Sequence, residues 1–210
     1  FMIHNLSIED RYDVADYEKD VLLLLKKLFL NHDAVVMTGG SGLFIDAVCN
    51  GLDSIPDISE ETRNRVNDLY EKGGVVALQN ELQHLDPEYY EIVDKQNPRR
   101  LQRAIEVCYQ TGLPYSSFRK NNTKERDFKI IKLALLWERN ELITRINKRV
   151  ENMISDGLVE EARSVYHKRN LNSLNTVGYK ELFQYFDGDL SLNEAIELIK
   201  ISTRQYAKRQ

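Results

Sequence analysis

Two arginines one helical turn apart stand near the start of a segment that opens with Asn97-Pro98. Arg99 and Arg103 lie four positions apart, and Gln110 falls on the same expected helix face. Positive charges so placed repel each other unless an anion or an acid neutralises them. Because guanidinium groups pair well with phosphate oxygens, this face could hold a phosphate backbone. An ordinary solvated helix surface is the alternative that the charge pattern leaves open.

A second pair of arginines, Arg145 and Arg149, has the same spacing in a segment expected to be helical. The two flank an apolar stripe on that helix. A bidentate guanidinium suits a diphosphate better than an ammonium does. A surface pair balanced by Glu141 or Glu151 is the competing interpretation. The residue types therefore allow a diphosphate site without requiring one.

A cluster of glycines, Gly39-Gly40-Ser41-Gly42, follows the short apolar run 34–37. The pattern predicts a buried strand that enters a tight turn and then a helix. Backbone N–H groups in such a turn can converge on an anion, helped by the partial positive charge at the helix start. The GxxxxGK[ST] spacing of a P-loop is absent from the sequence. A strand-to-helix turn without a ligand is the alternative.

Mostly helical segments must position these residues. The run 128–137 is a second strand candidate, and firm breaks separate short helices between the two strands. The pattern predicts an α/β fold with a core at 1–51 and 127–210, interrupted by a helical insertion at 52–126. Two strands are too few for a stable sheet, so further strands are expected before Phe1. The expected helices span about 13–30, 42–50, 59–72, a segment ending at 85, one starting at 86, 97–112, 140–156, 158–168, 176–186 and 192–209.

Composition excludes several classes of protein. The 210 residues are 42% hydrophobic and 30% charged, which indicates a soluble globular chain with no apolar run long enough to span a bilayer. A net charge of −4 argues against non-specific coating of nucleic acid but allows a local basic face. Cys49 and Cys108 are far apart and predict buried thiols in a reducing cytosol. The scattered histidines form no zinc pattern, and we expect no metal ligands.

Two of these segments together resemble a known enzyme family. The runs Thr38–Phe44 and Asn97–Val107 are similar to segments of the tRNA dimethylallyltransferases, which prenylate N6 of the adenine beside the anticodon, and the likeness extends along nearly the whole chain. Ser41 stands where the family usually has Thr, and Phe44 stands where it usually has Tyr, which removes a hydroxyl. The resemblance implies a partial P-loop-NTPase-like core, with the nucleotide- and ATP-binding character of that fold, carrying a helical tRNA-binding insertion.

The resemblance also implies roles for particular residues. Arg149 aligns with the arginine that binds and stabilises the diphosphate of the prenyl donor, Arg145 would contact the same substrate, and Ser41 would lie beside the active site. The segments similar to the family's tRNA-contacting regions contain Gly40, Ser41, Arg63, Arg99, Arg100, Leu101, Gln102, Arg103, Asn175, Thr176, Val177, Gly178, Tyr179, Lys180, Lys208, Arg209 and Gln210.

The implied reaction transfers a dimethylallyl group from dimethylallyl diphosphate to tRNA, with Mg²⁺ as cofactor. The resemblance further implies a cytoplasmic enzyme that is monomeric when intact and does not bind membranes. Family members carry a P-loop before the matched region, and an acidic general base follows soon after that P-loop. Neither feature is found in this sequence. The basic run at the end stops at Gln210. We therefore expect a fragment that lacks both ends of the enzyme, is inactive alone and contains no general base that can be named.

Two other functions remain open at this stage. A P-loop nucleotide or nucleoside kinase shares the strand–loop–helix logic and would also use arginines on a helical lid, but it would transfer phosphate from ATP. A non-catalytic RNA-binding fragment would bind an anticodon stem-loop with strong salt dependence and would show no chemistry that depends on diphosphate.

Overall fold

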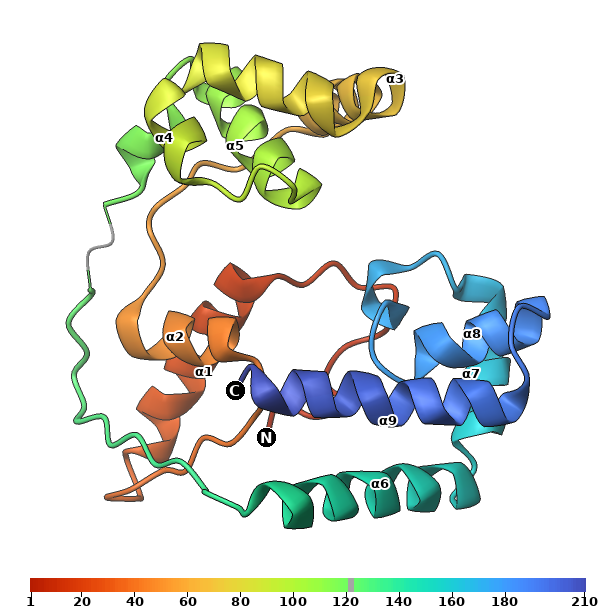
Figure 1. The fold of residues 1–210 in the computed structure, drawn as a ribbon. Coiled ribbons are helices and arrows are strands. Elements are labelled where there is room, and N and C mark those ends of the chain that lie inside the picture. Colours follow the sequence, from red (N-terminus) through yellow and green to blue (C-terminus); the bar gives the residue numbers. More distant parts are fainter. Residues whose placement is uncertain (121–122) are drawn as a thin grey trace. The chain divides into compact units, whose positions relative to one another are not determined.

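The computed structural model describes residues 1–120 and 123–210, and every regular element among them is helical (Figure 1). None of the described helices is long and apolar enough to cross a membrane. Short 3₁₀ turns cover Tyr115–Phe118, Tyr166–Lys168 and Asn172–Leu174. The α-helices are α1 (Val14–Leu28), α2 (Gly42–Asn50), α3 (Glu60–Leu85), α4 (Pro87–Ile92), α5 (Pro98–Thr111), α6 (Arg139–Ser155), α7 (Leu158–Val165), α8 (Tyr179–Asp187) and α9 (Leu192–Lys208).

Side-chain caps explain where several helices begin. Asp13 caps α1, and Oδ1 of Asn97 accepts a hydrogen bond from the backbone N–H of Arg100 at 3.3 Å at the start of α5. Ser191 and Glu194 form the capping box that their spacing predicts, since Oε2 of Glu194 accepts from the Ser191 N–H at 2.8 Å. Each of these caps depends only on residues close in sequence, so the sequence alone is enough to predict it.

A kink divides α3 where the sequence places two glycines. Gly74 has φ 62° and ψ −157°, which lies outside the helical region and suits a residue without a side chain. The sequence predicted that one helix stops at Gly73-Gly74 and another continues to Leu85. The helical segments on either side of the kink match that prediction.

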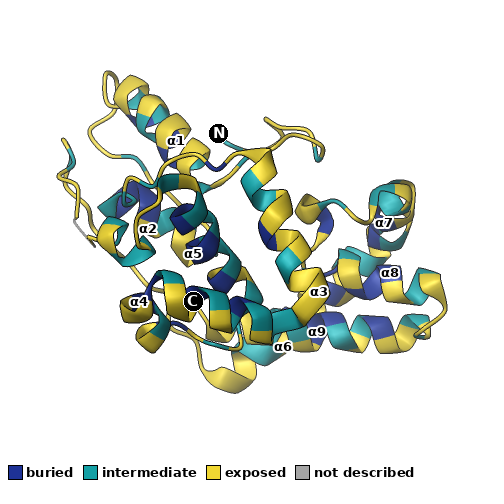
Figure 2. Ribbon diagram, turned by 90° about the horizontal axis from the view of Figure 1, so that it is seen from above, coloured by how far each residue is buried: buried dark blue, intermediate teal, exposed yellow. Residues whose placement is uncertain are grey.

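The chain divides into two compact units. One contains Phe1–Cys49 with Phe128–Gln210, and the other contains Asn50–Asp127. In the second unit α3 packs on α5 and α4, and the buried faces appear in dark blue in Figure 2. Its core is made of buried residues that include Val66, Leu78, Leu82, Tyr89, Leu101, Ala104 and Ile105.

In the second unit, a buried carboxylate links the start of α4 to the 3₁₀ turn that follows α5. Asp86 caps α4 through the Tyr89 N–H at 3.0 Å. The same carboxylate accepts from the Ser116 backbone N–H at 2.6 Å and from its hydroxyl at 2.9 Å. Because a buried carboxylate is costly without partners, these bonds stabilise the return of the chain after α5.

The first unit has two apolar clusters. Helices α6, α7, α8 and α9 pack around the larger one, which includes Val150, Leu182 and Ile199. Val21 and Leu25 of α1 form the smaller one with Val48 of α2. Helices α6 and α9 lie side by side along their length (Figure 1).

The two predicted strands are wrong. Residues 34–37 and 128–137 contain no strand, and the described part of the chain contains none anywhere. A strand needs a hydrogen-bonded neighbour, and neither run has one among the described residues. Apolar side chains in these runs face solvent instead, as the exposed fractions of 88% for Val36 and 89% for Leu133 show. The sheet remnant of the predicted α/β core is therefore not seen.

Candidate functional site

The glycine turn before α2 is open on most sides. None of Gly39, Gly40 and Gly42 has a positive φ, so backbone conformation does not require glycine here. A side chain built on Gly39 or Gly42 would meet nothing within 4 Å. The hydroxyl-bearing Ser41 is exposed. The turn therefore leaves its backbone and the Ser41 side chain accessible to a ligand.

The end of α9 lies against this turn. Nε2 of Gln210 donates a hydrogen bond to the carbonyl oxygen of Gly40 at 3.2 Å. Lys208 and Arg209, which precede Gln210 in the sequence, are exposed. The structure thus brings together two segments that are far apart in sequence and that were both predicted to contact tRNA.

The start of α5 presents the predicted arginines in different settings. Arg99 and Arg100 are exposed, whereas Arg103 is partly buried and places Nη1 3.7 Å from Oε2 of Glu106. Leu101 is fully buried, so its side chain belongs to the core of the second unit and cannot reach a ligand. Nε2 of Gln102 donates to Oδ1 of Asn67 on α3 at 3.1 Å, which fixes that amide.

Glu106 lies within reach of two predicted tRNA-binding arginines. Burial raises the pKa of the Glu106 carboxyl, and the positive charges of Arg103 and Arg63 partly offset that rise. Arg63 comes from α3 and Arg103 from α5, so the acid links arginines from both helices. Glu106 was not predicted as a site residue, because no local pattern shows that α3 brings Arg63 close to it.

The two arginines of α6 also differ. The guanidinium of Arg145 lies over the Trp137 ring, 4.1 Å from its centroid, and this cation–π contact occupies it. Arg149 is exposed, and its side chain has no hydrogen-bond or ion-pair partner among the described residues. Arg149 is therefore the freer of the two to bind an incoming anion.

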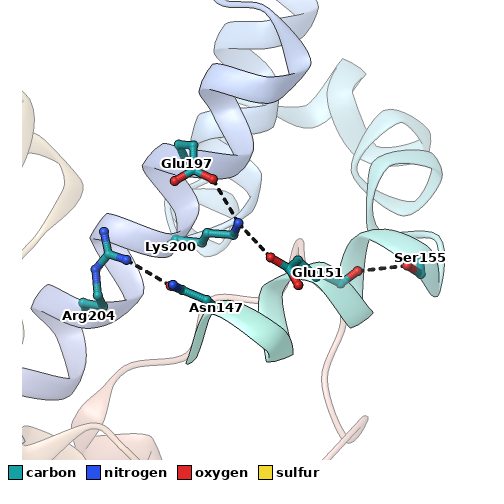
Figure 3. A network of polar contacts seen from close by, with 6 residues as sticks. All are labelled: Asn147, Glu151, Ser155, Glu197, Lys200 and Arg204. Carbon is teal, nitrogen blue, oxygen red and sulfur yellow. Dashed lines mark hydrogen bonds and ion pairs between the residues drawn. The ribbon is translucent and has the colours of Figure 1, made fainter. Parts of the chain in front are cut away.

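Polar contacts with α9 hold α6 in place (Figure 3). Nζ of Lys200 lies 3.0 Å from Oε1 of Glu151 and 2.9 Å from Oε1 of Glu197. Nη1 of Arg204 donates to Oδ1 of Asn147 at 2.9 Å. The contacts of Lys200 with Glu151 and of Arg204 with Asn147 orient the helix that carries Arg149. These two contacts were not predicted, because they join residues 49 and 57 positions apart in the chain.

The element 175–180 is only partly available to a ligand. Asn175 and Thr176 are exposed, but the hydroxyl of Tyr179 donates a hydrogen bond to Glu161. Burial, together with this bond and the negative charge of Glu161, raises the pKa of Tyr179 to about 12. The half-buried Val177 packs against the α6–α9 core.

Gly178 and Lys180 in the same element have structural partners. Gly178 is buried with φ 104°, a conformation that favours glycine, and its N–H donates to Oε2 of Glu181 at 2.8 Å. Oε1 of the buried Glu181 accepts from the Ser202 hydroxyl at 2.8 Å and lies 3.6 Å from Nζ of Lys180. These bonds tie the start of α8 to α9, so the element has a structural role of its own.

Comparisons with known proteins show which family the chain belongs to. The family model described as IPP transferase matches residues 1–210. The chain belongs to the IPP transferase family. It is 51% identical over 210 residues to "tRNA dimethylallyltransferase 1" of Phocaeicola vulgatus, covering 100% of this chain and 70% of that protein. It is 51% identical over 208 residues to the "tRNA dimethylallyltransferase" of Christiangramia forsetii, covering 99% and 69%.

Solved structures of IPP transferases are also similar to the chain. The full-length tRNA isopentenylpyrophosphate transferase from Bacillus halodurans matches with a TM-score of 0.62 at 31% identity, covering 100% of this chain and 66% of that one. A eukaryotic dimethylallyltransferase acting on tRNA matches with a TM-score of 0.76 at 22% identity, covering 98% and 53%. This second match supports the fold alone.

This IPP transferase family member builds no metal site from the residues that the structure describes. Within 1–120 and 123–210, no three His, Cys, Asp or Glu side chains come together in a way that could hold an ion. The Mg²⁺ that the family resemblance implied is therefore assigned to none of the described residues. Cys49 and Cys108 are buried free thiols, as the sequence predicted.

Proposed function

We propose that this chain serves as part of a tRNA dimethylallyltransferase, which transfers a dimethylallyl group from dimethylallyl diphosphate to N6 of the adenine adjacent to the anticodon. The observation that carries the proposal is the family match over all 210 residues, combined with an exposed Arg149 that is free of side-chain partners among the described residues. The same match disfavours the kinase alternative, since the relatives are prenyltransferases by name.

The chemistry defines what the protein must supply. The exocyclic amine of adenine attacks the allylic carbon, a C–N bond forms, the C–O bond to diphosphate breaks, and the amine loses a proton to a base. Because the carbon becomes cation-like while negative charge collects on the leaving group, guanidinium groups near the diphosphate lower the barrier. Arg149 is the residue that we assign to this role, and Arg145 contributes less because Trp137 already occupies it. We assign no residue of this chain as the general base.

We assign tRNA recognition to separate surfaces on the two units. Arg63, Arg99, Arg100 and Arg103 serve the second unit, and residues 40–41, 175–176 and 208–210 serve the first. Arginines that are exposed or held by a single acid can exchange that partner for a phosphate oxygen at small cost. We propose that residues 52–126 form the tRNA-binding insertion and that the remainder belongs to the catalytic core.

We further propose the setting in which the intact enzyme works. A tRNA substrate places it in the cytoplasm, as a monomer that does not bind membranes. A P-loop-type fold and the relatives' substrate class support nucleotide and Mg²⁺ binding by the intact enzyme. Among this chain's own described residues, no group of three or more His, Cys, Asp or Glu side chains could hold the ion.

A direct assay separates the functions. The purified chain is mixed with an anticodon stem-loop RNA and dimethylallyl diphosphate, and the RNA is analysed by mass spectrometry for one added isoprene unit. We expect salt-dependent RNA binding and no transfer by this chain alone, because no general base is found in it. Transfer would contradict that inactivity and strengthen the assigned reaction. Absence of RNA binding would contradict the tRNA-binding assignment, and phosphate transfer from ATP would favour a kinase.

A further inference from the structure

A cavity of about 560 Å³ lies in the second unit, between the segment that leads into α3 and the segment that follows α5. Its described lining belongs entirely to Asn50–Asp127, so one unit builds it. Cavities that hold small molecules have volumes of about 300–1,000 Å³. Among the described residues, the lining contains none of the arginines that we assign to diphosphate or RNA. The cavity therefore has room for a ligand that the proposed function does not use.

Part of the lining is apolar. Leu52, Leu113 and Phe118 contribute to it, and Leu113 exposes 54% of its surface. Among the described residues, none of these three belongs to the apolar clusters that form the cores of the two units. Each square ångström of apolar surface removed from water contributes about 25 cal/mol. An apolar ligand group would therefore gain binding free energy by covering a surface that the fold leaves partly uncovered.

The polar part of the lining has a net positive charge. Lys120 and Lys124 supply two cations and Asp53 supplies one anion, which leaves a net charge of +1. The exposed hydroxyl of Ser54 belongs to the same lining. Ammonium and hydroxyl groups donate hydrogen bonds to phosphate or carboxylate oxygens. An apolar surface combined with this charge favours a ligand that is apolar at one end and anionic at the other.

Contacts within the chain hold the backbone of Lys124 at the cavity. Its N–H donates a hydrogen bond to the carbonyl oxygen of Asn50 at 2.8 Å. Gly51 has φ 82°, and a Cβ atom built there would come within 2.7 Å of Cγ and 3.0 Å of Cβ of Lys124. Because Cβ of Lys124 is attached to the backbone, it cannot rotate out of the way. Conformation and space therefore both require glycine at position 51. A wall that is fixed before a ligand arrives lowers the entropy cost of binding.

We propose that this cavity binds a small amphipathic anion, whose apolar part contacts Leu52, Leu113 and Phe118 and whose phosphate or carboxylate group lies beside Lys120 and Lys124. This site goes beyond the proposed function, because it depends neither on RNA nor on the diphosphate ligand assigned to Arg149.

Hexyl phosphate is the probe for this site, and titration calorimetry on the full chain measures its affinity. We expect binding at least about tenfold weaker for inorganic phosphate and for hexanol, because each lacks one of the two parts. Hexanoate shows whether a carboxylate or a phosphate is preferred, and tighter binding of either anion than of hexanol supports the site. No binding of hexyl phosphate, or equal affinity for hexyl phosphate and inorganic phosphate, would overturn the proposal.

Two substitutions at exposed positions test the two parts of the lining. Leu113→Asn should weaken hexyl phosphate binding about fivefold and Lys120→Gln about threefold. Ile92→Asn on α4 and Lys72→Gln on α3 make the same changes at exposed positions of the same unit outside the described lining. These controls should change affinity less than about twofold. Equal losses from each variant and its control would also overturn the site.

A pair of glycine variants tests the wall at Lys124. Gly188 has φ 86°, and a Cβ atom there would meet nothing within 4 Å, so Gly188→Ala strains the backbone without a clash. Gly51→Ala adds a clash with Lys124 and should weaken hexyl phosphate binding more than Gly188→Ala does. Equal affinities would count against the site. Melting temperatures show that each variant is folded, and if Gly51→Ala does not fold, the variants at Leu113 and Lys120 decide.

A last variant separates this cavity from the proposed diphosphate site. Arg149→Gln should leave the affinity for hexyl phosphate unchanged, since Arg149 is outside the described lining. A loss of binding in this variant would place the probe at Arg149 and would overturn the proposal for the cavity. Because no measurement includes RNA or dimethylallyl diphosphate, failure of this inference leaves the proposed function untouched.

Discussion

Nζ of Lys200 on α9 lies 3.0 Å from Oε1 of Glu151 on α6, and this ion pair helps fix how the two helices face each other. One turn away, Arg204 donates to Asn147, so the two contacts set an antiparallel register between the helices. Arg149 falls between the two contacted residues of α6 in sequence, about 200° around the helix from the first of them. The contacts with α9 therefore keep Arg149 turned toward solvent.

Replacing Lys200 should lower stability modestly. Lys200→Met removes both ion pairs of a buried lysine whose partners are largely exposed, so we expect a loss of about 0.5–1 kcal/mol and a melting temperature about 1–4 °C lower. Lys148→Met, at an exposed position of α6, is the matched control and should change little. Calorimetry or circular dichroism measures both, and equal shifts for the two variants would contradict the assignment.

The contribution of Lys200 should also depend on pH in a defined direction. Hydrogen bonds to Glu197 and Glu151 raise the pKa of Lys200 above the ordinary value of 10.5. A cation with a raised pKa in the folded state stabilises fully below 10.5 and loses that stabilisation as pH rises through the raised value. The difference in melting temperature between the unmodified chain and Lys200→Met should therefore be constant near neutrality and shrink in strong alkali.

The two arginines of α6 should differ in diphosphate binding. Arg149→Gln removes a guanidinium that has no side-chain partner among the described residues, and we expect affinity for inorganic diphosphate to fall at least tenfold. Arg145→Gln should cost less, because Arg145 already stacks on Trp137. Titration calorimetry measures both, with stem-loop RNA affinity expected to stay unchanged. Equal losses for the two variants would count against Arg149 as the principal ligand.

Glu106 should oppose RNA binding near neutral pH and less so in mild acid. The pKa of Glu106 is higher in the folded protein than the ordinary carboxyl value of 4.5, because burial disfavours the ionised form. The free energy of unfolding should therefore decrease as the pH rises from 4.5 through the raised pKa. Glu106→Gln should therefore flatten that pH dependence and free Arg103 for phosphate, strengthening RNA binding about twofold to fivefold. Glu60→Gln, at the exposed start of α3, serves as the control for the change in net charge. Weaker RNA binding by Glu106→Gln would show instead that the acid is needed to orient Arg103.

The arginines at the start of α5 should act through charge. Arg99→Ala should weaken stem-loop binding and lower the salt slope by about one, since each lost phosphate contact releases one counterion fewer. Arg103→Ala should cost less, because this arginine is partly buried and already paired with Glu106. Anisotropy titrations at several salt concentrations measure both slopes. An unchanged affinity for both variants would mean that this helix face does not contact RNA.

Local features of the fold were predictable from the sequence. The caps at Asn97 and Ser191 and the kink at Gly74 depend on residues a few positions apart, and all three are present. The apolar face of α5 was readable from its periodicity, and Leu101 and Ile105 are fully buried. The predictions fail where a partner must come from elsewhere in the chain, as for the runs 34–37 and 128–137.

In the candidate site too, local residue patterns were predictable, and contacts between distant segments were not. Arginine spacing identified which side chains could meet anions, and Arg149 is indeed exposed on its helix. The contacts that decide which arginine is free, Trp137 under Arg145 and Glu106 beside Arg103, were not predicted. The hydrogen bond from Gln210 to the Gly40 carbonyl oxygen joins residues 170 positions apart in the sequence, and no pattern in either segment predicts it. Tertiary packing, which periodicity does not specify, sets these relationships.

The exposed run 128–137 should influence how this polypeptide behaves at high concentration. Leu133, Leu135 and Leu136 each expose more than four fifths of their surface, at 89%, 88% and 94%. An extended segment with unpaired backbone groups and exposed leucines tends to associate with similar segments of other molecules. Crowding should therefore drive this chain toward assemblies in which that run finds a neighbour.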